Sequence, residues 1–209
     1  VLSHGRLDFC IGAGWYEDEY RAYGYAFPDG PERLRQLDEA MQIILAMWTE
    51  PYATFEGQYY QVRGAINEPK GVQQPHPPIW LGGGGEKVTL KLAAKYADAC
   101  NIVAIDPEVC RHKFAVLRAH CARLGREYGG IVKSGHAFIC LLDDGETVED
   151  ALAAMQRITG YEQMTREALL RGTIVGSAAE VTRRLQALVA AGVEYFIVYF
   201  RNHLADGGS

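Results

Sequence analysis

The stretch Pro77-Pro78-Ile79-Trp80-Leu81-Gly82-Gly83-Gly84-Gly85 decides the fold of this 209-residue chain. The prolines favour extended backbone at the residues before them, and the apolar run that follows is typical of a buried strand. The strand stops at four consecutive glycines, and residues 86–96 carry the spacing of a helix. A buried strand, a glycine loop and a helix in this order are typical of an α/β fold with a parallel sheet.

Further strand and helix patterns alternate on both sides of this unit. Apolar runs predict strands at Leu7–Ile11, Ala99–Ala104, Ala137–Leu142 and Tyr195–Phe200, and aromatic alternation predicts a small hairpin over Thr54–Val62. Helices are predicted to begin over residues 29–32, to cover Pro107–Leu124, and to start at Thr147 and at Ser177, where Glu180 completes a capping box. About five parallel strands fit either a doubly wound sheet or part of a (β/α)8 barrel. Since no linker divides the chain, we expect a single domain.

The composition limits the classes of protein that need to be considered. Hydrophobic residues make up 48% of the chain and charged residues 22%, values that exclude wholesale disorder. The net charge of −5 argues against nucleic acid as a partner, and no apolar run is long enough to span a bilayer. The five cysteines form no Cys-x-x-Cys pair, which indicates buried thiols in a reducing cytoplasm rather than a metal site.

Two glycine loops, each after a predicted strand, are the candidate ligand sites. Residues Gly82, Gly83, Gly84 and Gly85 lack side chains, so their backbone amides can approach an anion closely, which predicts a phosphate cradle. A turn that only leads into the helix is the alternative. The loop is not a Walker A motif, because Glu86 stands where a glycine is required. Since ligands bind at the carboxyl ends of parallel strands, both loops are expected at one mouth.

The first loop, Gly12-Ala13-Gly14-Trp15-Tyr16-Glu17-Asp18-Glu19-Tyr20, carries more varied chemistry. It is not a dinucleotide fingerprint, since Glu17 replaces the third glycine, but glycines beside Trp15 and Tyr16 suit a planar aromatic ligand. The acids Glu17, Asp18 and Glu19 are the candidate catalytic residues for proton transfer, with a solvated acidic turn as the alternative. Arg201 follows the last predicted strand, where a cation would bind an anionic substrate or cofactor tail.

The series Gly12-x-Gly14-Trp15, Glu19-Tyr20, Phe55-x-Gly57-x-Tyr59-Tyr60 and Pro77-Pro78-Ile79-Trp80-Leu81-Gly82-Gly83-Gly84 resembles the luciferase-like monooxygenase superfamily. The resemblance runs from about Leu2 to Phe200 and is strongest to the branch that uses the 5-deazaflavin coenzyme F420. It implies an incomplete TIM barrel: a single luciferase-like domain over residues 1–209 that holds about the fourth to eighth strands and lacks the N-terminal part of the barrel and the final helix.

The resemblance also implies roles for the glycine loops. Residues Gly82–Gly85 match the cofactor-phosphate loop of the family, and Gly12, Ala13, Gly14 and Trp15 match the segment beside the cofactor ring. Asp18 matches a position near the cofactor. Related deazaflavin-dependent sugar-phosphate dehydrogenases carry a catalytic glutamate where this chain has Trp15, which cannot donate a proton at neutral pH, so that reaction is not expected.

These observations predict an oxidoreductase that transfers a hydride between coenzyme F420 and a small organic substrate. An FMN-dependent monooxygenase that uses O2 is the nearest alternative, because both cofactors present a phosphate and a three-ring system. An inactive fragment that folds only with a partner or as a homodimer is a second alternative. A phosphate-compound-binding module without flavin is a third.

Overall fold

The structure is a computed structural model, and it describes residues 2–157 and 164–200. In chain order the strands are β1 (Phe9–Ile11), β2 (Ala53–Glu56), β3 (Gln61–Ala65), β4 (Ile79–Gly82), β5 (Ala99–Ile102), β6 (Val132–Leu141), β7 (Thr173–Gly176) and β8 (Tyr195–Phe200). The helices are α1 (Glu17–Ala22), α2 (Gly30–Thr49), α3 (Thr89–Tyr96), α4 (Pro107–Leu124), α5 (Val148–Met155), α6 (Arg166–Gly172) and α7 (Ala178–Ala190), with a 3-10 turn at Tyr128–Gly130. No helix among the described residues has the length and apolar character needed to cross a membrane.

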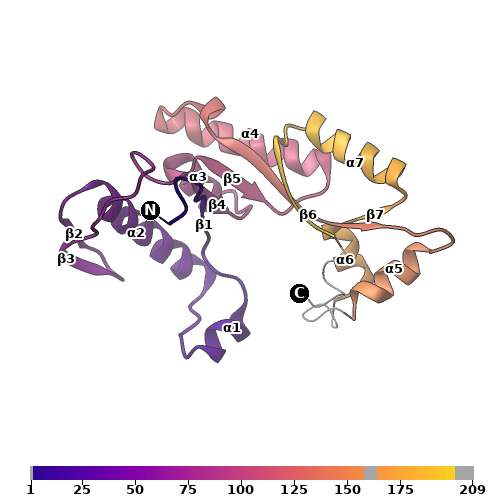
Figure 1. Cartoon of the computed structure of the whole chain (residues 1–209), viewed down its shortest axis with the longest axis horizontal. Helices are drawn as coiled ribbons and strands as arrows, with labels where there is room; N and C mark the ends of the chain where they lie inside the picture. The colour runs from indigo at the N-terminus through magenta and orange to yellow at the C-terminus, as the bar shows by residue number, and fades with distance from the viewer. Residues whose placement is uncertain (1, 158–163, 201–209) are drawn as a thin grey trace.

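Six strands form one parallel sheet, and β2 and β3 form a separate antiparallel hairpin (Figure 1). The sheet runs β1-β4-β5-β6, and β6 then pairs with two further strands. Residues 134–139 of β6 pair with β8, whereas residues 132–135 pair with β5 and residues 138–141 pair with β7. Because the β8 pairing overlaps both others, β5 and β7 share the opposite edge of β6.

The alternation of side chains along β4 separates the core from the ligand side of the sheet. Ile79 and Leu81 are fully buried and belong to the main hydrophobic cluster, together with Leu90 of α3 and Leu117 of α4. Trp80 and Gly82 point to the opposite face and line a cavity. A sheet with its helix-covered core on one face and a cavity on the other is part of a barrel rather than a doubly wound sheet, which has helices on both faces.

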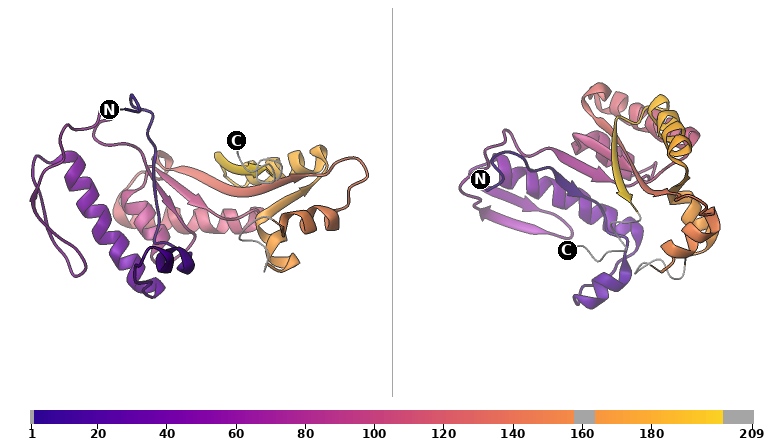
Figure 2. Two further views of the ribbon diagram at one scale, coloured as in Figure 1. Left: turned by 60° about the horizontal axis from the view of Figure 1, so that its bottom comes forward. Right: turned by 45° about the vertical axis from the view of Figure 1, so that its right-hand side comes forward.

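The helices pack beside one another along the core face. Helix α2 contacts α3, α3 contacts α4, and α4 contacts α7 (Figure 1). In α4 the helical spacing correctly predicts the buried face, since Cys110, Phe114, Leu117 and Cys121 are buried, although Leu124 is 45% exposed. Figure 2 shows the β2–β3 hairpin and α5 at opposite ends of the molecule in both views.

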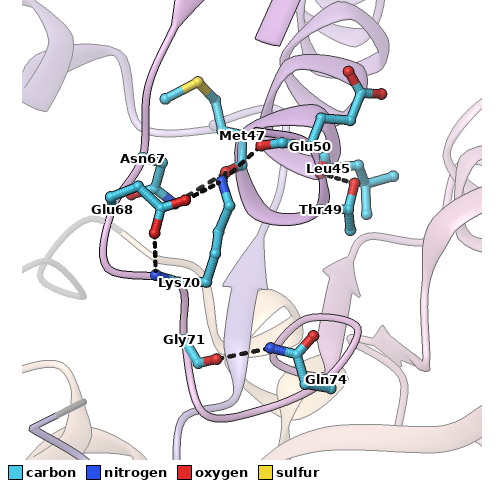
Figure 3. Close-up of polar contacts among 9 residues, drawn as sticks. All are labelled: Leu45, Met47, Thr49, Glu50, Asn67, Glu68, Lys70, Gly71 and Gln74. Atoms are coloured by element: carbon cyan, nitrogen blue, oxygen red, sulfur yellow. Dashed lines mark hydrogen bonds and ion pairs between the residues drawn. The ribbon is translucent and has the colours of Figure 1, made fainter. Parts of the chain in front are cut away.

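The loop after the hairpin is fastened to the carboxyl end of α2, and Figure 3 shows the contacts. Lys70 Nζ donates hydrogen bonds to the carbonyl oxygens of Met47 at 2.9 Å and Glu50 at 2.7 Å, and Asn67 Nδ2 donates to Met47 O at 3.1 Å. These donors satisfy carbonyls that a helix end leaves unpaired, and the ammonium charge opposes the helix dipole. The anchored loop leads directly into β4.

The hairpin itself is held by one carboxylate of α2. Glu39 accepts hydrogen bonds from the backbone amides of Gln58 at 2.8 Å, Tyr59 at 2.9 Å and Tyr60 at 3.0 Å. A Cβ atom on Gly57 would lie 2.3 Å from Glu39 Oε2, so a side chain there would displace this carboxylate. The aromatic hairpin therefore packs on α2, and none of its residues lines the main cavity.

Several elements differ from the prediction. The five expected parallel strands are present as β1, β4, β5, β6 and β8, but β6 begins at Val132, five residues before the predicted start. The sequence pattern missed β7, α1 and α6. The predicted helix over residues 86–96 was wrong at its start, because residues 86–88 form a turn and α3 begins at Thr89.

Candidate cofactor-binding site

A cavity of about 610 Å3 lies where β1, β4 and β5 end. Gly12, Ala13, Gly14 and Trp15 from the loop after β1 line it together with Gly82 and Gly83 from the end of β4. The two glycine loops therefore meet at one mouth, as their positions after parallel strands predict. The volume is within the range of roughly 300–1,000 Å3 that small-molecule and cofactor sites occupy.

The loop after β1 has no room for a side chain at Gly14. A Cβ atom on Gly14, whose φ is +77°, would lie 2.2 Å from Tyr20 Oη. Gly12 approaches the carbonyl oxygen of Gly82, with its Cβ position 3.4 Å from that atom. Trp15 is 85% exposed at the rim of the cavity, and its ring lies 5.3 Å from that of Tyr16. The loop thus presents bare backbone and one accessible aromatic face to the cavity.

The second loop combines one anchored amide with free ones. Gly83, at φ +127°, donates its amide hydrogen to the carbonyl oxygen of Asn101 at 2.9 Å. The amides of Gly84 and Gly85 have no hydrogen-bond partner among residues 2–157 and 164–200. They line a smaller cavity of about 340 Å3 whose wall includes Lys87 and Lys113. Glu86 also lines this cavity and pairs with Lys113 at 2.6 Å, so Lys87 is its one cation without an ion pair among the described residues. Unpartnered amides beside this ammonium group form an arrangement that fits an anion.

Contacts to α4 explain why α3 begins later than predicted. Glu86 Oε1 accepts hydrogen bonds from Lys113 Nζ at 2.6 Å and His112 Nε2 at 3.1 Å. His120 Nε2 donates to the backbone carbonyl of Glu86 at 2.8 Å. These bonds hold residues 86–88 in a turn against α4, and the hydrogen bond from Lys113 lowers the pKa of the Glu86 carboxyl despite the opposing effect of burial. The helix dipole consequently starts three residues beyond the position that the sequence pattern predicted.

The acidic candidates Glu17, Asp18 and Glu19 form the first turn of α1 and are exposed. Glu17 pairs with Arg21 at 2.8 Å on the same helix. None of the three lines the cavity. Their exposed placement matches the alternative of a solvated acidic turn and gives no geometric support to proton transfer within the cavity. Arg201 lies outside the described residues.

Arg33 of α2 lines the cavity and was not predicted as a site residue. Its guanidinium carbon lies 3.9 Å from the centroid of the Phe27 ring, and Nη1 donates to the carbonyl oxygen of Pro28. Its Nε is buried and has no hydrogen-bond partner among the described residues. A cation within an otherwise apolar helical stripe was the sequence signal that could have identified it.

Asn101 of β5 is a second cavity residue that sequence reasoning missed. Ser134 Oγ of the neighbouring β6 donates to Asn101 Oδ1 at 3.1 Å. This bond fixes the amide and leaves its NH2 group as a donor. A polar side chain in the middle of the apolar strand Ala99–Ile102 was the available signal.

His136 lies farther along the same face of β6, among aromatic rings. Its ring centroid is 5.4 Å from that of Phe138 and 5.3 Å from that of Tyr199. Burial in this apolar setting lowers the pKa of His136. This setting favours the neutral imidazole, and His136 forms no ion pair with a carboxylate among the described residues.

Solved structures share this fold. An F420-dependent secondary alcohol dehydrogenase, in complex with an F420–acetone adduct, superposes with a TM-score of 0.81 at 18% identity, over 97% of this chain and 67% of that one. The EDTA monooxygenase of Chelativorans sp. BNC1 superposes with a TM-score of 0.72 at 15% identity, over 96% of this chain and 62% of that one. Figure 1 therefore shows part of a TIM barrel of the luciferase-like type, as the resemblance implied.

In sequence, the chain is 24% identical to the FMNH(2)-dependent dimethylsulfone monooxygenase of Pseudomonas putida, over 95% of this chain. It spans 62% of that enzyme's length.

The fold and cavity define a partial parallel α/β barrel with its ligand cavity at the carboxyl ends of the strands. More particularly, the chain belongs to the luciferase-like monooxygenase family, whose model matches residues 1–195. Members of this family are oxidoreductases, and the relatives named above include both F420-dependent and FMNH2-dependent enzymes.

Proposed function

We propose that this chain binds coenzyme F420 and supports hydride transfer between the cofactor and a small organic substrate. The observation that carries the proposal is the pair of unpartnered amides at Gly84 and Gly85 beside a cavity of about 610 Å3 lined by the other glycine loop. The amides fit a phosphoryl group, and the cavity fits a flat ring system.

The glycine geometry supports this fit. A Cβ atom on Gly83 would lie 2.9 Å from Thr89 Cγ2, and one on Gly85 would lie 2.8 Å from Thr89 Oγ1. Side chains at these positions would displace the amides, so the loop keeps its bare backbone available to an anion. The ring would then lie beside Gly12, Ala13, Gly14 and Trp15.

The cofactor supplies the two-electron chemistry, and the protein supplies binding and orientation. In this arrangement Gly84 and Gly85 would hold the phosphoryl group, and Trp15 would lie beside the ring. The NH2 group of Asn101 is placed to donate to a carbonyl in the cavity, either of the ring or of the substrate. Asp18 lies outside the cavity wall, so we assign it no contact to the ring.

Spectral titration of the chain with F420 and with FMN tests the proposal. We expect saturable changes in the F420 absorbance and weaker changes with FMN. Tight FMN binding without F420 binding would overturn the preference for F420.

An FMN-dependent monooxygenase that uses O2 is the second candidate function. The similarity to the dimethylsulfone monooxygenase favours it, because that relative is FMNH2-dependent. Substrate-dependent oxygen uptake after addition of reduced FMN would support this function over hydride transfer with F420.

A third candidate is a chain that is inactive alone and requires a partner or a second copy of itself. Tyr195, Tyr199 and Phe200 of β8 are 51%, 46% and 41% exposed, which supports association through this strand. Substrate turnover by the monomeric chain would exclude this candidate. Four of the five free cysteines are buried, and this pattern supports the proposal of a reducing, cytoplasmic location.

A further inference from the structure

A groove with basic side chains leads away from the glycine loop. The small cavity of about 340 Å3 beside Gly84 and Gly85 shares Leu34 and Thr89 with the main cavity. It shares Leu34, Lys87 and Val88 with a further cavity of about 460 Å3 that lies between α2 and α3. The three cavities are therefore adjacent, and the two smaller ones form what we call the basic groove.

The charge of the basic groove is opposite to that of the chain as a whole. Five cations line it, Arg35, Lys87, Lys91, Lys95 and Lys113, against two carboxylates, Asp38 and Glu86. Four of the six lysines of the chain lie here, although the net charge of the chain is −5. This concentration creates a local positive field in an acidic protein.

Two of these cations are free to meet a ligand. Lys95 pairs with Asp38 at 3.0 Å, and Lys113 pairs with Glu86 at 2.6 Å. Arg35 donates a hydrogen bond to Tyr59 Oη at 2.8 Å. Lys87 and Lys91 are exposed and form no ion pair within the described parts of the chain. The groove therefore offers two uncompensated ammonium groups just beyond the free amides of Gly84 and Gly85.

The lysine spacing indicates the shape of the ligand. Lys91 and Lys95 are four residues apart on α3, and Lys87 lies four residues before Lys91, in the turn that leads into the helix. Side chains at this spacing lie on one face of a helix, and four residues rise by about 6 Å. Cations repeated at such intervals match a flexible chain of separated carboxylates better than a compact diphosphate.

We infer that the basic groove binds an acidic tail, made of repeated carboxylates, that continues from the phosphoryl group of the bound cofactor. This inference rests on the proposed function and refines it. FMN ends at its phosphate, whereas F420 continues beyond its phosphoryl group into a chain of glutamyl carboxylates. A groove for such a tail would favour F420 over FMN at this site.

The test compares the affinities of the chain for three ligands: F420 with one glutamyl residue, F420 with five or six, and FMN. Each dissociation constant is measured at low salt by fluorescence titration of the wild type and of the double variant Lys87→Gln/Lys91→Gln. The matched control is Arg183→Gln, which removes an exposed cation from α7, a helix that packs on α4 and lines neither cavity of the basic groove.

We expect the wild type to bind the long-tailed F420 roughly tenfold more tightly than the short-tailed form, as two partly exposed ion pairs would give. The double variant should lose this difference and keep its affinity for the short-tailed form, and Arg183→Gln should behave as the wild type. Equal affinity of the wild type for the two tail lengths would overturn the inference while leaving the proposed function intact. Absence of binding of every F420 form would overturn the proposed function and the inference with it.

Discussion

Gly12 lies beside Gly82 at the mouth of the barrel, so close that a Cβ atom added to Gly12 would lie 3.4 Å from the carbonyl oxygen of Gly82. One loop follows β1 and the other follows β4, and the two strands are neighbours in the sheet. The two glycines therefore bring the loop that fits a ring next to the loop that fits a phosphoryl group. A Cβ atom alone would make an ordinary contact with Gly82, but a larger side chain at Gly12 would extend into the cavity that this residue lines.

Gly12→Val should therefore weaken cofactor binding strongly while the sheet stays folded. The branched side chain enters the space next to Gly82 and also occupies the cavity. We expect at least a tenfold rise in the F420 dissociation constant, measured by fluorescence titration, with little change in the far-UV circular dichroism. Gly71→Ala is the control, because a Cβ atom there meets nothing within 4 Å. An unchanged dissociation constant for Gly12→Val would show that the loop contact does not shape the site.

Alanine variants of Gly83 and Gly84 should separate the effect of this loop on the stability of the fold from its effect on cofactor binding. Gly83→Ala imposes a side chain at φ +127° and against Thr89, so it should lower the free energy of unfolding by about 1–2 kcal/mol. Gly84→Ala places its methyl group 3.9 Å from Lys113 Cε, an ordinary contact, and should leave unfolding unchanged. It should nevertheless weaken cofactor binding by obstructing the free amide. Urea denaturation and ligand titration of both variants check this, and equal affinities of Gly84→Ala and the wild type would contradict it.

Lys70→Met should show how much the contact between the loop and α2, drawn in Figure 3, contributes to the free energy of unfolding. The variant keeps the length of the side chain but removes both hydrogen bonds to the carbonyls of Met47 and Glu50 and the charge at the helix end. We expect a loss of about 1–2 kcal/mol in the free energy of unfolding, measured by urea denaturation. Lys91→Met, at an exposed position on α3, should change stability far less. A similar loss in both variants would mean that the cap contributes nothing specific.

His136 should make the stability of the protein depend on pH in a defined direction. Burial lowers the pKa of His136 in the folded state, so the unfolded state binds the proton more readily. The neutral imidazole costs no stability above the unfolded pKa of about 6.5, and stability is lost as the pH falls from that value through the lower pKa of the folded state. The melting temperature of His136→Gln should therefore drop less between pH 7.5 and pH 5.5 than that of the wild type. His4→Asn, at an exposed position, should follow the wild type, and parallel curves for all three proteins would refute the assignment.

The helix starts that could be predicted from the sequence are those stabilised by capping hydrogen bonds between residues close together in the chain. The capping box of Ser177 and Glu180 starts α7 as predicted, and Asp29 accepts a hydrogen bond from the Glu32 amide at the start of α2. Helix α1 escaped prediction because it buries no residue and so has no apolar periodicity. Strand β7 escaped because its four residues are defined by pairing with the distant end of β6.

The candidate site also has a part that could be predicted from neighbouring residues and a part that depends on contacts between distant segments. Its glycine loops were visible in the sequence, because four consecutive glycines after an apolar run have a direct physical meaning. The role of Lys113 could not be predicted, because this residue lies on α4 and contacts the end of the loop only by donating a hydrogen bond to Glu86. Ile197 joins the cavity from β8, more than a hundred residues beyond the glycine loop, and no spacing rule anticipates that contact.

The unequal pairing of the strands has a consequence for the order in which the structure opens. Strand β6 is ten residues long and hydrogen-bonds to three neighbours, so its amides should exchange with solvent most slowly. Strand β1 has three residues and pairs with β4 alone among the described strands, so it should fray first and carry Gly12 with it. A ligand bound in the cavity should then slow deuterium exchange in β1, the least protected strand of the sheet, and have little effect on β6, which already exchanges slowly.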